Sequence, residues 1–256
     1  MAAIKDIEMI GFDLETTGAD KETAHIVTLS LTNPEKDILI NPAIPIEEGA
    51  AQVHGITNER AKAEGVPITD ILDGFLVDLT NIINSDDKVL VGFNLIFDLT
   101  ILEYEAKRNN ITPLSQRVEY PFPILDGFVL DKAINPFRKG KRTLETLAGI
   151  YDVEGLVAHN GLSDARASIG VIKGILSNNH TNTDPRIAQM DFMSLDHKVL
   201  ANWHIPWREK QNRSTWDYFV NTMGRQDFVL ESGFPIEDRA IGRTPVDYNA
   251  ETGYQN

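Results

Sequence analysis

Two kinds of apolar segment alternate along the first 176 residues, and this alternation constrains the fold more than any other feature. Three short runs come first, at residues 8–15, 25–32 and 37–41, and each has the length and composition of a β-strand. Turn-type residues at 33–36 separate the second run from the third. The second and third runs are therefore predicted to pair as a hairpin.

Segments with helical periodicity follow the hairpin. Residues 69–84 place apolar side chains at the three- and four-residue spacing of an amphipathic helix, with Thr69 as the expected N-cap. A buried strand is expected at 88–93, a helix from Asn94, and a further helix at about 162–176. Strands that alternate with helices predict an α/β domain with a mixed sheet whose faces are covered by helices.

Composition excludes several classes of protein. The chain has 256 residues, of which 42% are hydrophobic, and this is enough for a large folded core. It has no cysteine, so disulfides, thiolate nucleophiles and Cys-ligated metals are excluded, and a metal ion would need oxygen or imidazole ligands. No run approaches the roughly 18 apolar residues of a membrane span, and the N-terminal pattern is not that of a signal peptide. We therefore expect a cytoplasmic protein with no membrane partner.

The net charge of −14 is unevenly distributed along the chain. Residues 1–90 contain 17 acidic and 6 basic residues (net −11), whereas residues 91–256 contain 21 acidic and 18 basic residues (net −3). Because polyanion binding depends on Lys and Arg, the overall charge argues against nonspecific adhesion to nucleic acid. The second part of the chain is the one expected to approach a phosphate backbone.

Two carboxylates stand inside the first strand, which is otherwise apolar. Asp13 and Glu15 lie two residues apart, so their side chains share one face, where a bound cation would relieve their repulsion. Asp98 and Asp164 each fall in the first turn of an expected helix, where a lone Asp is usually a cap. Four such acids form a set of hard oxygen ligands suited to Mg²⁺ or Mn²⁺, and His159 precedes the last of them.

The order and setting of these residues resemble the DnaQ-like 3′–5′ exonucleases, in the DEDD class that carries a histidine. This family includes the proofreading epsilon subunit of bacterial DNA polymerase III and bacterial and phage relatives. The resemblance covers about residues 7–176 and is carried by residues 13–18 (DLETTG), 94–98 (NLIFD) and 159–165 (HNGLSDA). The segment 54–57 (HGIT) is also similar to one that the family has between the first two motifs.

The resemblance implies a ribonuclease H-like fold and the hydrolytic removal of nucleotides from a 3′ end with two divalent cations, Mg²⁺ or alternatively Mn²⁺. The four acids would be metal ligands and catalytic residues, and His159 would be the general base, since imidazoles titrate near neutral pH. Thr16, Thr17, Asn94 and Phe97 are expected near the terminal nucleotide. The expected substrate is the 3′ end of single-stranded or frayed DNA, in proofreading or repair.

Two alternative functions stay open. The same chemistry on RNA 3′ ends differs in contacts to a 2′-hydroxyl, which no motif of this sequence identifies. A non-catalytic nucleic-acid-binding module on the same fold is disfavoured, because all five catalytic-type positions are filled.

The densest basic run has two interpretations. It contains Arg138, Lys139, Lys141 and Arg142 around a single glycine. These side chains either hold substrate phosphates or belong to a solvated loop before a capped helix, and the sequence favours neither interpretation.

We expect an exonuclease domain at residues 1–180 and a mainly helical C-terminal extension at 181–256 that packs on it and has a polar end. All three tryptophans lie between positions 203 and 216, and we expect them to anchor this extension rather than to stack on bases. Residues 189–193 faintly resemble a peptide that binds a sliding clamp. A clamp or a DNA polymerase is therefore a candidate partner.

Overall fold

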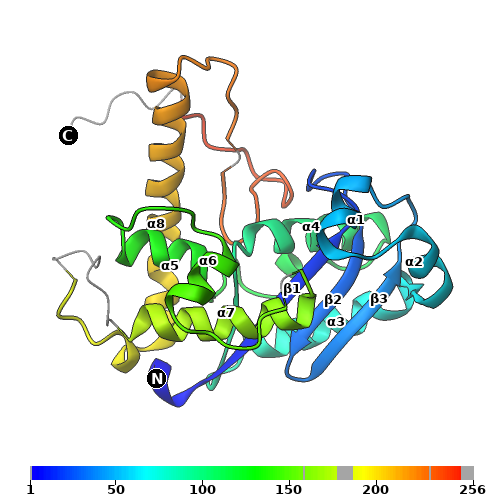
Figure 1. The fold of residues 1–256 in the computed structure, drawn as a ribbon, viewed down its shortest axis with the longest axis horizontal. Helices are drawn as coiled ribbons and strands as arrows, with labels where there is room; N and C mark the ends of the chain where they lie inside the picture. The colour runs from blue at the N-terminus through cyan, green and yellow to red at the C-terminus, as the bar shows by residue number, and fades with distance from the viewer. Residues whose placement is uncertain (1, 158, 178–186, 231, 249–256) are drawn as a thin grey trace.

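The computed structural model describes residues 2–157, 159–177, 187–230 and 232–248. Within them the strands form a mixed sheet in the order β4-β3-β2-β1-β5-β6. Helices lie on both of its faces (Figure 1). The predicted fold class is confirmed. The strands are β1 (Glu8–Thr16), β2 (Ile26–Thr32), β3 (Glu35–Asn41), β4 (Val66–Pro67), β5 (Lys88–Gly92) and β6 (Ile124–Asp126).

The central strand β1 pairs antiparallel with β2 and parallel with β5, which makes the sheet mixed. β2 and β3 form the predicted antiparallel hairpin, and Glu15 lies opposite Thr28. The register of β1 against β2 shifts between Glu15 and Thr16. Such an irregularity bends a strand and re-aims its side chains, and here it lies at the end of β1 that carries two of the predicted metal ligands.

Eight α-helices and four short helical turns accompany the described strands. The α-helices are α1 (Glu48–His54), α2 (Asn58–Glu64), α3 (Ile68–Ile83), α4 (Ile96–Arg108), α5 (Gly127–Ile134), α6 (Leu144–Ile150), α7 (Gly161–Leu176) and α8 (His197–Asp217). The turns are η1 (Ile4–Asp6), η2 (Leu114–Gln116), η3 (Phe192–Ser194) and the π-type η4 (Tyr218–Thr222).

The alternation of side chains along β1 divides the core between the two faces of the sheet. Ile10, Phe12 and Leu14 pack with α3 and α4 on one face. Met9 packs on the other face with residues of α5, α6, α7 and α8. Because side chains alternate along a strand, Asp13 and Glu15 face the α7 side of the sheet. There α7 packs across β1 and β2 (Figure 1).

The structure corrects two predicted helix starts. The helix expected at 69–84 is present as α3, but Thr69 is not its N-cap. Pro67 occupies that position, where no side chain accepts a hydrogen bond, and the Thr69 hydroxyl contacts the Asp70 carboxylate inside the first turn. Helix α4 likewise begins at Ile96, two residues after Asn94.

The described residues of the predicted C-terminal extension form η3, the long helix α8, η4 and otherwise irregular chain. The expected polar end of the extension lies partly outside the described residues. Trp203 and Trp207 pack against the core, and the centroids of their rings are 5.7 Å apart. Trp216 is buried with Val220 and Tyr248. The division at residue 180 stays a prediction. No helix among the described residues has the length and apolar content needed to cross a membrane.

The resemblance of residues 189–193 to a clamp-binding peptide stays a prediction, and the fold does not present the aromatic ring of this segment to a partner. Phe192, its aromatic residue, is completely buried in the core. An extended peptide that presents this ring to a partner would first have to leave the fold.

Candidate active site

Three carboxylates meet where α7 begins beside β1. Asp13 and Glu15 come from β1, and Asp164 lies in the first turn of α7, which is capped by Asn160. Each offers a carboxylate oxygen, and the three oxygens all lie within 4.8 Å of one another. This is a spacing that allows one cation to contact several of them.

The fourth acid, Asp98, reaches the same place from the opposite face of the sheet. It lies in the first turn of α4 and is 5% exposed. Its Oδ1 accepts a hydrogen bond from the backbone N–H of Leu14 at 3.1 Å. The structure therefore brings together all four acids that the sequence singled out, although their catalytic role stays a prediction.

The electrostatics of this cluster are unfavourable when all four groups are ionised. Burial, and then the charges of Asp98, Glu15 and Asp164, raise the pKa of Asp13 well above its ordinary value. Burial is also the main cause that raises the pKa of Asp98 well above its ordinary value, that of Glu15 to about 7 and that of Asp164 to about 6. Bound cations would oppose each of these shifts.

The residues fit divalent cations by their chemistry. All four side chains supply oxygen, the ligand that Mg²⁺ and Mn²⁺ prefer. Asp164 Oδ1 is buried and has no hydrogen-bond partner among the described residues. A carboxylate oxygen left in this state costs free energy unless a positive charge compensates it. The cluster is therefore suited to metal binding.

His159 lies at the rim of the cluster. It is exposed and has a positive φ of 61°, and its backbone N–H donates to Asp164 Oδ2 at 3.0 Å. A small cavity of about 120 Å³ is lined by His159, Glu15, His54 and Arg60 among others. The imidazole and a metal-ligand candidate thus face the same opening.

The two threonines after the first motif do not offer free side chains. The Thr16 hydroxyl donates to the carbonyl of Gly18 at 2.8 Å, and the Thr17 hydroxyl accepts from the backbone N–H of His25 at 2.9 Å. Both residues are buried. These hydroxyls fix the turn after β1, and the expected place of Thr16 and Thr17 near the terminal nucleotide stays a prediction.

Asn94 lies in the turn before α4, and Phe97 lies in the first turn of that helix. Asn94 has a positive φ of 62°, and its backbone N–H donates to Asp126 Oδ1 at 3.0 Å. Phe97 is half-buried and packs against the core. Their predicted contact with a terminal nucleotide stays a prediction.

The basic run is divided by the structure. Arg138 and Arg142 both bind the fully buried carboxylate of Asp131, Arg138 Nη2 at 2.7 Å. Their side chains are only 7% and 14% exposed. The interpretation of these two arginines as free phosphate ligands is corrected, since their guanidinium groups compensate a buried charge. Lys139 and Lys141 are exposed.

Asp126 is the residue of the site region that the sequence reasoning missed. Its carboxylate accepts from the backbone N–H groups of Asn94, Leu95 and Phe128 at 2.8 to 3.0 Å, so it caps α5 and also holds the turn before α4. Its charge contributes to the raised pKa of Asp98, which places it next to the cluster. The signal was an Asp between a short apolar run and Gly127, which is typical of a helix N-cap.

Comparison with known families decides the classification of this fold and site. The model of an exonuclease family, RNase T, matches residues 6–172. The chain belongs to this exonuclease family. It is accordingly a nuclease that acts on nucleic acid, and the match includes both the β1 acids and the start of α7.

Solved structures of similar fold include Exonuclease I of Methylocaldum szegediense, at 18% identity and a TM-score of 0.53, with 68% of this chain and 41% of that chain covered. Escherichia coli Exonuclease I in complex with a dA16 oligonucleotide is 17% identical, also with a TM-score of 0.53, and 70% of this chain and 42% of that chain are covered. Identities this low show a shared fold alone. The chain spans about two fifths of the length of these nucleases. No curated protein matches it.

Proposed function

We propose that the protein is a metal-dependent 3′–5′ exonuclease that removes terminal nucleotides from single-stranded or frayed DNA. The observation that carries this proposal is the convergence of Asp13, Glu15 and Asp164 within 4.8 Å, beside Asp98, in a chain of an exonuclease family. The resemblance of the three motifs to the DnaQ-like class with histidine supports the direction of hydrolysis.

Asp13, Glu15, Asp98 and Asp164 would hold the divalent cations, for which Mg²⁺ is proposed and Mn²⁺ is the alternative. Two such cations, when bound, would make the attacking water more acidic and would stabilise the charge that develops on the leaving 3′ oxygen. The protein contributes the frame. β1, α4 and α7 fix the four carboxylates, and the hydrogen bond from Leu14 keeps the Asp98 carboxylate oriented.

His159 would act as the general base. It is exposed, it faces the same small cavity as Glu15, and its own backbone N–H holds Asp164. This arrangement couples the position of the imidazole to that of a metal ligand. A positioned general base contributes about 10²- to 10⁴-fold to a rate.

Single-stranded DNA is proposed as the substrate because nucleases of the same fold have been solved with single-stranded oligonucleotides. RNA 3′ ends are the second candidate, and a binding module without hydrolysis is the third. Proofreading or repair in the cytoplasm is the role that the family resemblance suggests. Burial of Phe192 argues against recruitment by a sliding clamp through residues 189–193.

The test is the shortening of 5′-labelled DNA and RNA strands of one sequence, with and without Mg²⁺. We expect stepwise shortening of the DNA strand that requires Mg²⁺ and disappears in the isosteric variant Asp13→Asn. Absence of shortening for both strands would overturn the enzyme proposal. Immediate release of the labelled 5′ nucleotide would indicate hydrolysis from the 5′ end instead. Faster shortening of the RNA strand would favour the second candidate.

A further inference from the structure

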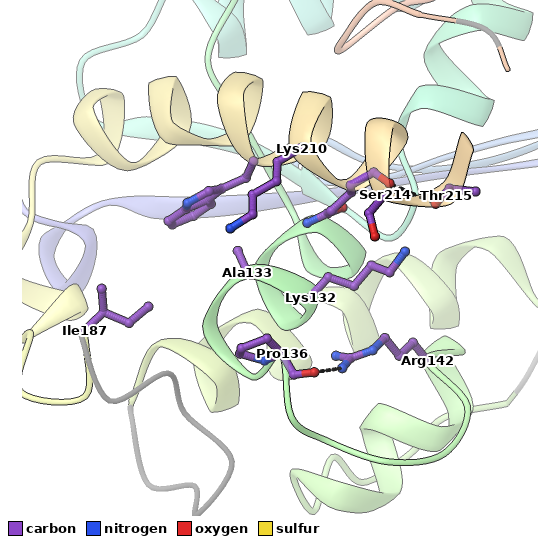
Figure 2. A pocket seen from close by; sticks show the side chains of 10 residues that line it. Lys132, Ala133, Pro136, Arg142, Ile187, Lys210, Ser214 and Thr215 are labelled. Carbon is purple, nitrogen blue, oxygen red and sulfur yellow. Dashed lines mark hydrogen bonds between the residues drawn. The ribbon is translucent and has the colours of Figure 1, made fainter. Parts of the chain in front are cut away.

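A second cavity, of about 600 Å³, lies between α5 and α8 and shares no lining residue with the cavity at His159. Its lining includes the cations Lys132, Arg142 and Lys210, and no acidic side chain. Figure 2 shows the side chain of Lys210 extending from α8 towards Ala133 of α5, and the side chains of Lys132 and Arg142 to the right of both. We call this cavity the α5–α8 pocket. Its volume is in the range of sites that hold a nucleotide-sized ligand.

The pocket concentrates positive charge on a chain whose net charge is −14. Among the described residues, no carboxylate pairs with the ammonium of Lys132 or Lys210 within 4.0 Å. Burial, and then the neighbouring charges of Arg208 and Arg142, lower the pKa of Lys132. Mutual repulsion of this kind is relieved by a bound anion. The chemistry of the lysines is therefore that of a phosphate site.

The α8 side of the pocket offers a hydrogen-bond acceptor and an aromatic ring. Gln211 Oε1 is buried and has no hydrogen-bond partner among the described residues, whereas its Nε2 donates to the carbonyl of Val129 at 3.0 Å. The indole of Trp207 also lines the pocket and is held by its contact with Trp203. An acceptor that needs an N–H group and an aromatic ring are suited to a nucleobase, which offers N–H groups and a π face.

We propose that the α5–α8 pocket binds one nucleotide unit of the single strand away from the end that is hydrolysed. Lys132 and Lys210, whose side chains extend in opposite directions along the pocket, contact the phosphates on the two sides of this unit, and Trp207 and Gln211 contact its base. The inference rests on the proposed function in taking a strand, rather than a free nucleotide, as the ligand. Asp126 links the pocket to the acid cluster, because it caps α5 and holds the turn before α4.

The experiment measures binding without hydrolysis. The probe is a fluorescein-labelled oligothymidylate of about twelve nucleotides, titrated in EDTA over a salt series. The variant Lys132→Gln/Lys210→Gln is compared with Lys5→Gln/Lys173→Gln, which removes the same charge from exposed positions outside the pocket. We expect the pocket variant to bind about tenfold more weakly at low salt. We also expect its salt slope to be smaller by about 1.4, from two lost contacts at about 0.7 each on a single strand.

The outcomes separate this inference from the proposed function. Unchanged affinity of the pocket variant overturns the inference, even if Mg²⁺-dependent shortening is intact. Weaker binding supports the inference, even if the wild-type protein shortens no strand. Thymidine monophosphate is titrated as a competitor, and displacement at concentrations equal to that of the strand overturns the choice of a strand as ligand. Lys210→Gln alone, at an exposed position, repeats the test without any change on α5.

Discussion

The carboxylate of Asp98 is bonded to the backbone of Leu14, the residue between Asp13 and Glu15, at 3.1 Å. This contact connects the first turn of α4 to the strand that carries the other two acids. Asp98 therefore has two roles that substitutions can distinguish. Its bond to Leu14 needs an oxygen acceptor, whereas cation binding needs a negative charge.

Asp98→Asn keeps the acceptor for the Leu14 N–H and removes the charge. We expect hydrolysis to fall by about 10²-fold or more, with the folded state retained, because a neutral amide is a poor divalent-cation ligand. Asp98→Ala also leaves the Leu14 N–H unpaired and is expected to cost about 1–3 kcal/mol of stability. Steady-state hydrolysis and urea unfolding measure the two effects. Equal activity of wild type and Asp98→Asn would contradict the assignment.

The metal-free protein is expected to lose stability as the pH rises. The pKa of Glu15 is raised from 4.5 to about 7 and that of Asp164 from 3.8 to about 6, so the folded state retains protons that the unfolded chain releases at lower pH. The free energy of unfolding in EDTA should therefore decrease between about pH 4 and pH 7, by on the order of 2 kcal/mol. Unfolding curves across this range measure it.

Two further measurements test this pH dependence, one with the variant Glu15→Gln and one with added Mg²⁺. Glu15→Gln should flatten the decrease, because the amide does not titrate. Saturating Mg²⁺ should stabilise the protein more at pH 8 than at pH 5, since it binds the ionised carboxylates. A stability that rises with pH in EDTA would show that the four carboxylates are not crowded as described.

Asp126 is expected to act on the site through the turn before α4. Asp126→Ala leaves the N–H groups of Asn94 and Leu95 without their acceptor, and we expect about 2–4 kcal/mol of destabilisation and a kcat at least tenfold lower in the folded protein. Asp196→Ala is the control, because Asp196 is also an N-cap whose carboxylate accepts two backbone N–H groups, at the start of α8. It should lower stability and leave kcat unchanged. Equal effects of both variants on kcat would exclude a positioning role.

Gly11 sets the distance between β1 and α7. A Cβ at this position would overlap the backbone carbonyl of Ala165, the residue after Asp164, so Gly11→Ala must move α7 away from β1. We expect lower stability, by about 1–3 kcal/mol, and weaker hydrolysis. Gly149→Ala in α6 is the control, since its Cβ would meet nothing within 4 Å and it should be neutral or slightly stabilising. Thermal unfolding and hydrolysis report the two effects.

The sequence predicted the parts of the site that depend on local periodicity. Asp13 and Glu15 were placed on one face by strand alternation, and Asp98 and Asp164 by their positions at helix starts. It did not predict the partner of Arg138 and Arg142, because the buried charge that holds them comes from Asp131, seven residues before the first arginine, and its burial depends on the packing of α5.

Local signals also failed where tertiary structure determined the outcome. Thr69 is a residue type that is typical of an N-cap, but Pro67 is the N-cap of α3. Pro67 is the last residue of β4, so the pairing of β4 with β3 determines where the helix begins. Phe192 has the setting of a surface peptide in the sequence and is nevertheless buried with residues of α7 and α8. The helix α5, with only eight residues, was too short to be identified by periodicity.

The most direct test of the central claim is a titration of the protein with Mn²⁺, followed by electron paramagnetic resonance of the free ion. The claim is that Asp13, Glu15, Asp98 and Asp164 form the divalent-cation site. It predicts that the wild-type protein removes Mn²⁺ from the free pool and that Asp13→Asn and Glu15→Gln, correctly folded by circular dichroism, lose most of this binding. Unchanged Mn²⁺ binding in both variants would contradict the claim.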